Sequence, residues 1–321
     1  MQRIKVAVLR GGPGTESEVS FKTGKNVIDN LPDKYVPVDV FISRSGEWHL
    51  DGVAISPAKL FSHIDVVFNA LHGEYGEDGE IQKLLDQFKV KYTGSTALAS
   101  ALGMNKAMAK KIFVNNGLKT PVFAVVKKKD DINFLANDIF KTFPMPAIVK
   151  PNGSGSSVGV SIVRMIKDIV PALKEAFKHS EIAIVEEFIS GKEATCGVIE
   201  KFKGQDIYSL LPIEITKPKE YEFFNYDAKY SGKSKEICPG NFSKEESKTM
   251  QEMAKLAHKV LGLRHYSRSD FIVHPKRGVY ILEANTLPGL TKESLLPVSL
   301  EALGVSMSQF LDHVLTLALG K

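Results

Sequence analysis

The stretch IVKPNGSGSSVGVSIV, residues 148–163, has the composition of a phosphate-binding loop but places its lysine before the glycines. In the common P-loop, GxxxxGK[ST], the lysine follows the glycines and a helix begins at once. Here Lys150 ends an apolar, strand-like run, and a second β-branched run, Val158–Val163, follows the glycines, which predicts a hairpin. A tip rich in glycine and serine can bring several backbone N–H groups onto phosphate oxygens, and Lys150 could reach a nucleotide from the strand. A flexible surface hairpin would have the same composition, so this stretch alone leaves both interpretations open.

Around this hairpin, the apolar pattern divides the chain into three units. In residues 1–98, strand-like and helical segments alternate, which predicts a parallel α/β sheet. Residues 99–185 hold the hairpin and the segments around it, and in residues 186–321 strands follow one another, which predicts an antiparallel sheet in an α+β unit. The predicted strands are Ile4–Leu9, Val36–Ile42, Val66–Ala70, Val122–Val126, Ala147–Lys150, Val158–Val163, Ile182–Ile189, Ala194–Glu200, Asp206–Ile215, Tyr266–His274 and Gly278–Ala284. The predicted helices run from near Ser17, after the capping-box spacing of Thr15–Glu18, to Asn30, and over Ile81–Phe88, Ser95–Asn116, Ile132–Thr142, Ile166–His179, Ser243–Leu261 and two closing segments.

The charge and cysteine content exclude several classes of protein. The formal net charge of +5 arises from 42 basic and 37 acidic residues scattered over 321 positions, whereas a nucleic-acid-binding protein concentrates its basic residues. The two cysteines, Cys196 and Cys238, lack CxxC spacing, which argues against a disulfide framework or a zinc site. No apolar run approaches the roughly 20 residues that cross a bilayer, and no signal peptide precedes the first strand. We therefore expect a soluble, cytoplasmic protein with no nucleic-acid or membrane partner.

Two strands near the end of the chain carry polar residues that face one way. Arg268 and Asp270 lie two apart on one strand, as do Glu283 and Asn285 on the other, so each pair shares a face. A hairpin turn at 274–278 pairs residues whose numbers sum to 553, which places Asp270 opposite Glu283 and Arg268 opposite Asn285. Two carboxylates and an amide oxygen are ligands of the kind that hold Mg²⁺ together with water and phosphate oxygens. Merely solvated strand residues are the alternative.

Two loops supply the remaining candidates. His72 lies in the glycine-rich segment LHGEYGEDG, residues 71–79, directly after an apolar strand, and so at the carboxyl end of a sheet, where α/β proteins bind ligands. A lone histidine at such a place can equally be structural. Lys229 and Tyr230 lie in a long polar loop at about residues 217–242, and loops of this length are often functional lids. A plain exposed loop is the alternative there.

Taken together, nine segments resemble the D-alanine–D-alanine ligases of the ATP-grasp superfamily, in order and over essentially the whole chain. The segments are GGPGTESEVS, ALHGEYGEDG, YTGS, NKAMAK, IVKPNGSGSSVGV, VEEFISGKE, YDAKY, SRSDF and EANTLPGLT. The resemblance implies a three-domain ATP-grasp architecture, α/β and α+β. An N-terminal parallel α/β domain (1–98) would bind substrate, and the sheets of a central (99–185) and a C-terminal (186–321) subdomain would sandwich ATP.

The resemblance also implies a reaction and its residues. One D-alanine carboxylate would attack the γ-phosphate of ATP, and the amine of a second D-alanine would displace phosphate from the D-alanyl phosphate, giving D-alanyl-D-alanine for peptidoglycan precursors. The ATP contacts would be Lys106, Lys150, Ser156, Ser157, Glu186, Glu187, Ile189, Glu193 and Lys229. The ligands of two Mg²⁺ ions, or of Mn²⁺ instead, would be Asp270, Glu283 and Asn285. The substrate-binding and catalytic residues would be Glu16, His72, Ser156, Tyr230, Arg268, Gly289, Ser294 and Leu295. The family is usually dimeric, so we also expect a homodimer.

Tyr230 bears on which substrate is accepted. Together with Glu16 and Ser156 it would form a hydrogen-bonded trio joining the N-terminal domain, the hairpin and the lid. A tyrosine here is similar to the peptide-forming ligases and unlike the D-alanine–D-lactate enzymes. Those enzymes, or another ATP-grasp carboxylate–amine ligase, are the enzymatic alternative. A nucleotide-binding regulator is the non-enzymatic one, although no GxGxxG follows the first strand.

Overall fold

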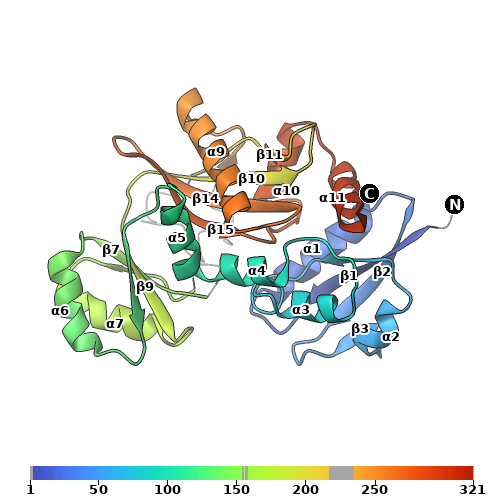
Figure 1. Ribbon diagram of the computed structural model, residues 1–321, viewed down its shortest axis with the longest axis horizontal. Helices are drawn as coiled ribbons and strands as arrows, with labels where there is room; N and C mark the ends of the chain where they lie inside the picture. Colours follow the sequence, from blue (N-terminus) through green and yellow to red (C-terminus); the bar gives the residue numbers. More distant parts are fainter. Residues whose placement is uncertain (1–2, 154, 156–157, 217–234, 321) are drawn as a thin grey trace.

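The computed structural model describes residues 3–153, 155, 158–216 and 235–320, whose helices and strands form three units (Figure 1). The first unit, in blue, and the second, in green, lie at opposite ends of the view, and the third, in orange and red, lies above and between them. Four predicted site residues, Ser156, Ser157, Lys229 and Tyr230, fall outside the described residues, as does most of the predicted lid loop. Their roles stay predictions.

The first sheet is covered on both faces, as the continuous apolar runs of its central strands require. Its strand order is β4-β3-β2-β1-β5. In β1, Val6 and Val8 pack into a cluster that includes Val27 of α1, whereas Ala7 and Leu9 pack into a cluster with residues of α2 and α3. The elements of this unit are β1 (Ile4–Gly11), α1 (Ser17–Asn30), β2 (Tyr35–Ile42), β3 (Trp48–Leu50), β4 (Val53–Ala54), α2 (Pro57–Phe61), β5 (Val66–Asn69) and α3 (Glu80–Gln87).

The prediction of a parallel sheet is right for only part of this unit. β2, β1 and β5 are parallel, but β3 and β4 extend the sheet beyond β2 in antiparallel order. The sequence does not reveal these two strands because segments of three and two residues carry too little alternation. α1 begins at Ser17, as predicted, but the predicted capping box is wrong: the N-cap residue Glu16 makes no side-chain capping hydrogen bond.

The second unit is an antiparallel sheet with the order β6-β9-β7-β8. Ala147 and Val149 of β7 pack with α6 and α7 in one apolar cluster. The predicted hairpin is present, since Ala147 pairs with Val163, but its second arm begins at Ser161 and not at Val158, because residues 158 and 159 form a turn. The elements are β6 (Phe123–Lys127), α6 (Ile132–Thr142), β7 (Ala147–Pro151), β8 (Ser161–Val163), α7 (Ile166–Ala176) and β9 (Ile182–Glu187).

The third sheet is antiparallel, as predicted, with the order β13-β12-β10-β14-β15 and β11 paired to β10. The single strand predicted over Asp206–Ile215 is two strands. The helix predicted over Ser95–Asn116 is also two helices, which meet at Asn105, whose side chain accepts the Met108 N–H at 3.0 Å. Both helices pack with α9 against β14 and β15. The elements are α4 (Ala97–Met104), α5 (Lys106–Asn115), β10 (Lys192–Glu200), β11 (Ile207–Ser209), β12 (Ile213–Thr216), β13 (Lys235–Ile237), α9 (Lys244–Val260), β14 (Tyr266–His274) and β15 (Gly278–Asn285).

The last two helices return the chain to the first unit. α10 (Leu295–Ala302) and α11 (Met307–Leu319) follow β15, and α11 lies beside the first sheet in Figure 1. Phe310, Leu311 and Val314 of α11 share a buried cluster with Val8 and Phe68 of that sheet. Among the described residues no single helix is long and apolar enough to cross a membrane, although the bent pair α10 and α11 meets that criterion when the two are counted together.

A buried histidine joins the first and third units. His265 is 4% exposed, and its Nδ1 accepts the Gly94 N–H at 3.1 Å, so the neutral ring carries its proton on Nε2. Burial, aided by the charge of Arg264, lowers the pKa of His265 to about 3. Arg264 itself donates to the Gly94 and Tyr92 carbonyls at 2.9 and 3.3 Å. Arg264 and His265 together therefore fix the backbone at Tyr92 and Gly94, where the chain leaves the first unit.

This histidine predicts a loss of stability in mild acid. The pKa of an unfolded histidine is about 6.5. Below that pH the unfolded chain binds a proton at this position that folded His265 does not bind. As the pH is lowered from about 6.5 towards the folded pKa, the free energy of unfolding therefore falls by about 1.4 kcal/mol per pH unit. His265→Asn keeps an acceptor near the Nδ1 position and tolerates the φ of 68°, but it does not titrate. Urea unfolding at pH 7.5 and 5.5 should show the wild type losing about 1.4 kcal/mol more than the variant. Equal losses in both proteins would contradict the assignment.

Candidate active site

A cavity of about 610 Å³ is lined by residues of all three units. Its walls come from the ends of β5, β7 and β9, from the paired strands β14 and β15, and from the loop between β15 and α10. Every predicted site residue that the structure describes lines it: Glu16, His72, Lys106, Lys150, Glu186, Glu187, Ile189, Glu193, Arg268, Asp270, Glu283, Asn285, Gly289, Ser294 and Leu295. The fold therefore brings together residues that lie up to 279 positions apart (295 minus 16).

Glu186, Lys110 and Lys150 form a buried ion cluster in one wall, which we call the Glu186 cluster. The Glu186 Oε1 lies 2.9 Å from the Lys150 Nζ and 3.1 Å from the Lys110 Nζ. Glu186 and Lys150 project from the paired strands β9 and β7, on the face opposite the α6 and α7 helices. Lys110 reaches the same carboxylate from α5 and also donates to the Thr120 Oγ1 at 2.7 Å.

Burial and charge act in opposite directions on this cluster. Burial lowers the pKa of Lys110 to about 8, although the Glu186 carboxylate favours its charged form. Burial also opposes charge on the other two groups, but the neighbouring opposite charges outweigh it, so the pKa of Lys150 is raised and that of Glu186 is lowered. Near neutral pH the cluster therefore holds two cations and one anion, and its surplus positive charge would attract a polyphosphate.

The paired strands β14 and β15 have the predicted register at the cavity. Asp270 pairs with Glu283 and Arg268 with Asn285, so the residue numbers of each pair add up to 553, as predicted. A bulge directly after Asp270 shifts the pairs nearer the turn, where His274 pairs with Gly278 and the sum is 552. The bulge leaves the two polar pairs side by side.

Both carboxylates of this pair are bound to basic side chains of the protein. The Arg268 Nε donates to the Asp270 Oδ1 at 2.9 Å and its Nη2 to Oδ2 at 3.0 Å. The Thr195 hydroxyl donates to the Asp270 Oδ1 at 2.7 Å, and the Lys106 Nζ lies 3.1 Å from the Glu283 Oε2. A divalent cation at this place would therefore compete with Arg268 and Lys106 for carboxylate oxygens.

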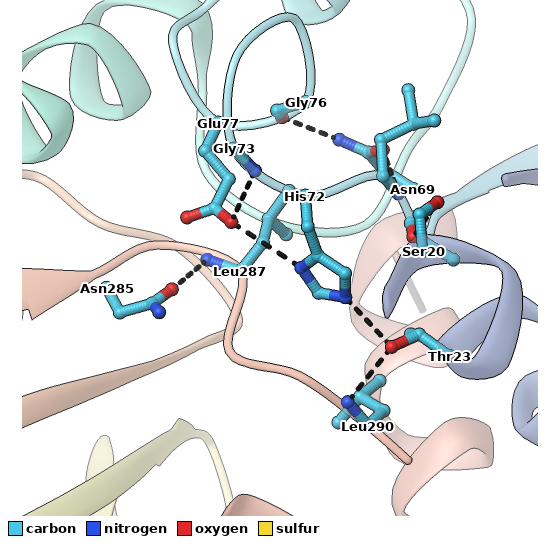
Figure 2. A network of polar contacts seen from close by, with 12 residues as sticks. Ser20, Thr23, Asn69, His72, Gly73, Gly76, Glu77, Asn285, Leu287 and Leu290 are labelled. Atoms are coloured by element: carbon cyan, nitrogen blue, oxygen red, sulfur yellow. Dashed lines mark hydrogen bonds and ion pairs between the residues drawn. The ribbon is translucent and has the colours of Figure 1, made fainter. Parts of the chain in front are cut away.

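His72 lies between Glu77 and Thr23 in the loop that follows β5 (Figure 2). Its Nδ1 is 3.5 Å from the Glu77 Oε1, and its Nε2 is 2.8 Å from the Thr23 Oγ1. Glu77 also accepts the Gly73 N–H at 3.1 Å, which fixes the carboxylate. The tautomer that carries its proton on Nδ1 satisfies both neighbours, since a carboxylate oxygen accepts and Nε2 can then accept the Thr23 hydroxyl proton.

Glu16 lies where this loop meets the glycine-rich hairpin. A Cβ on Gly73 would come within 2.5 Å of the Glu16 Oε2, and a Cβ on Gly155 within 3.0 Å. Gly73 also has a φ of +66°, a conformation that glycine adopts without strain. Glycines in both segments therefore make room for one carboxylate.

The loop between β15 and α10 brings Gly289 and Ser294 together. The Ser294 Oγ lies 3.1 Å from the Thr291 N and 2.8 Å from the Thr291 Oγ1, and a Cβ on Gly289 would come within 2.9 Å of it. Ser294 is the N-cap residue of α10 but makes no side-chain capping bond. Its hydroxyl therefore faces the loop and the cavity, with Leu295 beginning the helix beside it.

Glu187 ties two walls of the cavity to each other. Its carboxylate accepts two hydrogen bonds from the Arg277 guanidinium, at 2.6 and 3.1 Å. These bonds connect β9 to the turn between β14 and β15. Ile189, just beyond β9, is buried with Ile272 and Tyr280 of the third sheet. Glu193 is the second residue of β10 and pairs with Ile272 of β14. These contacts hold the second and third sheets on either side of the cavity.

Several residues of the site cannot be recognised in the sequence. Lys110 looks like a solvated helix residue, and Thr195 like an ordinary strand threonine, because their partners lie far away along the chain. Glu77 could have been found, since its spacing from His72 within one glycine-rich loop places them close together. Glu236 of β13 also lines the cavity, and burial raises its pKa.

Comparison with known proteins finds the same family over the whole chain. The family model described as the D-ala D-ala ligase C-terminus matches residues 112–316, and the model of the D-ala D-ala ligase N-terminus matches residues 52–95. The chain is 39% identical over 316 residues to the D-alanine–D-alanine ligase of Geotalea uraniireducens, covering 98% of this chain and 95% of that one. It is 36% identical over 320 residues to the ligase of Geobacter sulfurreducens, covering 98% and 94%.

Solved structures give the same result. The D-alanine–D-alanine ligase of Bacillus anthracis in complex with ATP has a TM-score of 0.81 and 30% identity, covering 99% of this chain and 98% of that one. The VanG D-Ala:D-Ser ligase of Enterococcus faecalis has a TM-score of 0.87 and 31% identity, covering 99% and 100%. The expected ATP-grasp fold is confirmed, and this chain belongs to the D-alanine–D-alanine ligase family.

Proposed function

We propose that this protein joins two D-alanine molecules into D-alanyl-D-alanine, with D-alanyl phosphate as the intermediate and ADP and phosphate as the other products. The observation that carries the proposal is the cavity that Lys150 and Glu186, the Asp270–Glu283 pair, His72 and Ser294 line together. From the family resemblance we further propose that the product supplies peptidoglycan precursors and that the enzyme acts in the cytoplasm as a homodimer.

ATP would bind along the wall formed by the second and third sheets. Lys106 supplies positive charge for the phosphates, and so does the Glu186 cluster, in which two lysines share one carboxylate. Glu187, Ile189 and Glu193 would complete the ATP contacts. The carboxylate of the first D-alanine then attacks the γ-phosphorus and ADP leaves. This step depends on holding two anions together and on balancing their charge, which is what a cluster of fixed basic side chains provides.

The side chains of Asp270, Glu283 and Asn285 fit Mg²⁺ by their chemistry. In nucleotide sites this ion takes one or two carboxylates together with water and phosphate oxygens. Among the described residues, no group of three or more His, Cys, Asp or Glu side chains could hold a metal by itself, so nucleotide oxygens would complete the coordination. When bound, one or two Mg²⁺ ions, or Mn²⁺, would neutralise phosphate charge.

The second step would take place between α1, the His72 loop and the loop that holds Gly289. Glu16 would hold the ammonium group of the first D-alanine, with His72 nearby. Ser294 and the Leu295 N–H would hold the carboxylate of the second, whose amine attacks the acyl carbon. Arg268 and the Gly289 N–H would stabilise the oxyanion before phosphate leaves and the amine loses its proton.

Phosphate release and product mass test the function. With Mg·ATP and D-alanine alone we expect phosphate release with second-order dependence on D-alanine at low concentration, and a product with the mass of D-alanyl-D-alanine. The same assay with added D-lactate or D-serine compares acceptors. Turnover only with another acceptor would keep the ATP-dependent chemistry and overturn the substrate. No turnover with any D-amino acid would overturn the proposal.

A further inference from the structure

Two side chains of α1 hold the backbone of Leu290 from both sides. The Asn26 Nδ2 donates to the Leu290 carbonyl at 2.7 Å, and the Leu290 N–H donates to the Thr23 Oγ1 at 3.4 Å. Thr23 and Asn26 lie three positions apart, so their side chains leave one face of the helix about one turn apart. Both are buried, as is Leu290. We call these two residues the α1 clamp.

Neighbouring groups fix the orientation of the clamp. The Asn30 Nδ2 donates to the Asn26 Oδ1 at 3.1 Å, which leaves the Asn26 N–H groups to face Leu290. The Leu290 N–H can only donate, so the Thr23 oxygen accepts from it, and the same oxygen lies 2.8 Å from the His72 Nε2. Figure 2 shows Thr23 between His72 and Leu290. Each clamp residue therefore has one arrangement that satisfies all its partners.

Leu290 lies between the two residues, Gly289 and Ser294, that this loop would contribute to the second step. Gly289 precedes it, and Thr291 follows it and is bonded to Ser294. Residues 286–294 have no regular helix or strand, so their conformation depends on bonds such as those of the clamp. A shift of the Leu290 backbone would therefore move Gly289 and Ser294 together.

We propose that Thr23 and Asn26 are positioning residues for the second substrate and that they act by holding Leu290. Neither residue lines the cavity, so neither touches the substrates directly. Thr23 also connects His72, beside the first substrate, with the loop that receives the second. The inference rests on the proposed ligation and adds to it residues that control the second step more strongly than the first.

The two steps can be measured separately. Isotope scrambling of β,γ-bridge ¹⁸O in ATP, at D-alanine concentrations that fill only the first subsite, reports reversible acyl phosphate formation. Dipeptide formation over a range of D-alanine concentrations reports the second step and the KM of the second D-alanine. In Asn26→Leu, scrambling should stay within about twofold of the wild type while dipeptide formation falls roughly 10- to 100-fold, the usual effect of a small misplacement. Thr23→Val should show a similar loss of dipeptide formation and a smaller loss of scrambling, because it also removes the hydroxyl that contacts His72.

Conservative and matched variants separate positioning from general damage. Thr23→Ser keeps the hydroxyl and should restore dipeptide formation to within about threefold. Lys25→Ala lies on the same helix but removes only an exposed ion pair with Asp29, so both steps should be unchanged. Thermal unfolding identifies variants that do not fold, and because the two clamp variants are independent, one of them suffices for the test.

The outcomes distinguish this inference from the proposed function. If the wild type forms dipeptide and the clamp variants form it at the same rate, the inference is overturned and the proposed function stands. Equal losses of scrambling and dipeptide formation in a folded clamp variant would also overturn it, since that pattern indicates damage to the whole site. A wild type that forms no dipeptide would instead overturn the proposed function, and the inference with it.

Discussion

Replacing Asp270 with asparagine should lower the rate of D-alanyl-D-alanine formation at least about 1000-fold, which corresponds to about 4 kcal/mol of transition-state stabilisation. Asparagine has the same shape but no charge, and its NH₂ group replaces one of the two oxygens that accept hydrogen bonds from Arg268. The substitution therefore removes one proposed Mg²⁺ ligand and also the bidentate partner of Arg268. Single-turnover product formation, measured over a range of Mg²⁺ concentrations, checks this result.

Thr195→Val is the matched control for Asp270. It removes the hydroxyl that donates to Asp270 at 2.7 Å but leaves both carboxylates and Arg268 in place. Its effect should be about tenfold, the usual consequence of one lost hydrogen bond to a charged group. If Asp270→Asn kept more than a tenth of wild-type activity at any Mg²⁺ concentration, the proposed metal role of Asp270 would be wrong.

Glu186→Gln should lower the free energy of unfolding by about 3–5 kcal/mol, because it leaves two buried lysines without their shared counter-charge. Lys110 has the lower pKa already, so it would lose its proton first in the variant. In the unfolded chain Lys110 would keep that proton up to about pH 10. The unfolded variant therefore binds more protons than the folded one, and its stability should rise with pH more steeply than that of the wild type. Urea unfolding between pH 7 and 9 checks both the loss and its slope.

Glu187→Gln is the control for Glu186, since the two carboxylates are adjacent on β9. Glu187 pairs with Arg277, whose side chain is 44% exposed, so water can replace the lost partner and the loss of stability should be much smaller. Similar losses in the two variants would contradict the view that burial of the Glu186 cluster makes its charge balance important. A flat pH dependence in Glu186→Gln would show that Lys110 keeps its proton.

The parts of the site that the sequence predicts are those set by local periodicity. Residues two apart on a strand share a face, and the position of a short turn fixes the sum of the residue numbers in each antiparallel pair. The pairing of Asp270 with Glu283 therefore follows from the sequence. The bulge after Asp270 does not follow from it, because an extra residue in one strand changes no polar or apolar pattern. The glycine-rich hairpin is likewise predicted from composition and the β-branched run after it, although the start of its second arm is not.

The parts that the sequence does not predict depend on contacts between distant segments. Thr23 and Leu290 are 267 positions apart, and nothing near either residue indicates the other. Lys110 is missed for a related reason: a lysine within a helical stretch is usually exposed, and its burial depends on its distant partner Glu186. The break at Asn105 was hidden because both sides of it have helical composition.

The packing of α11 against the first sheet affects how the chain can be synthesised. Val8 and Phe68 are made early, but the apolar surface that covers them comes from Phe310 and Leu311 at the far end of the chain. Until α11 is made, the part of this face that α1 does not cover is exposed to solvent and available to chaperones or to other nascent chains. Completion of the first unit therefore waits until α11 has been made, and chains that lack α11 would expose an apolar surface that favours aggregation.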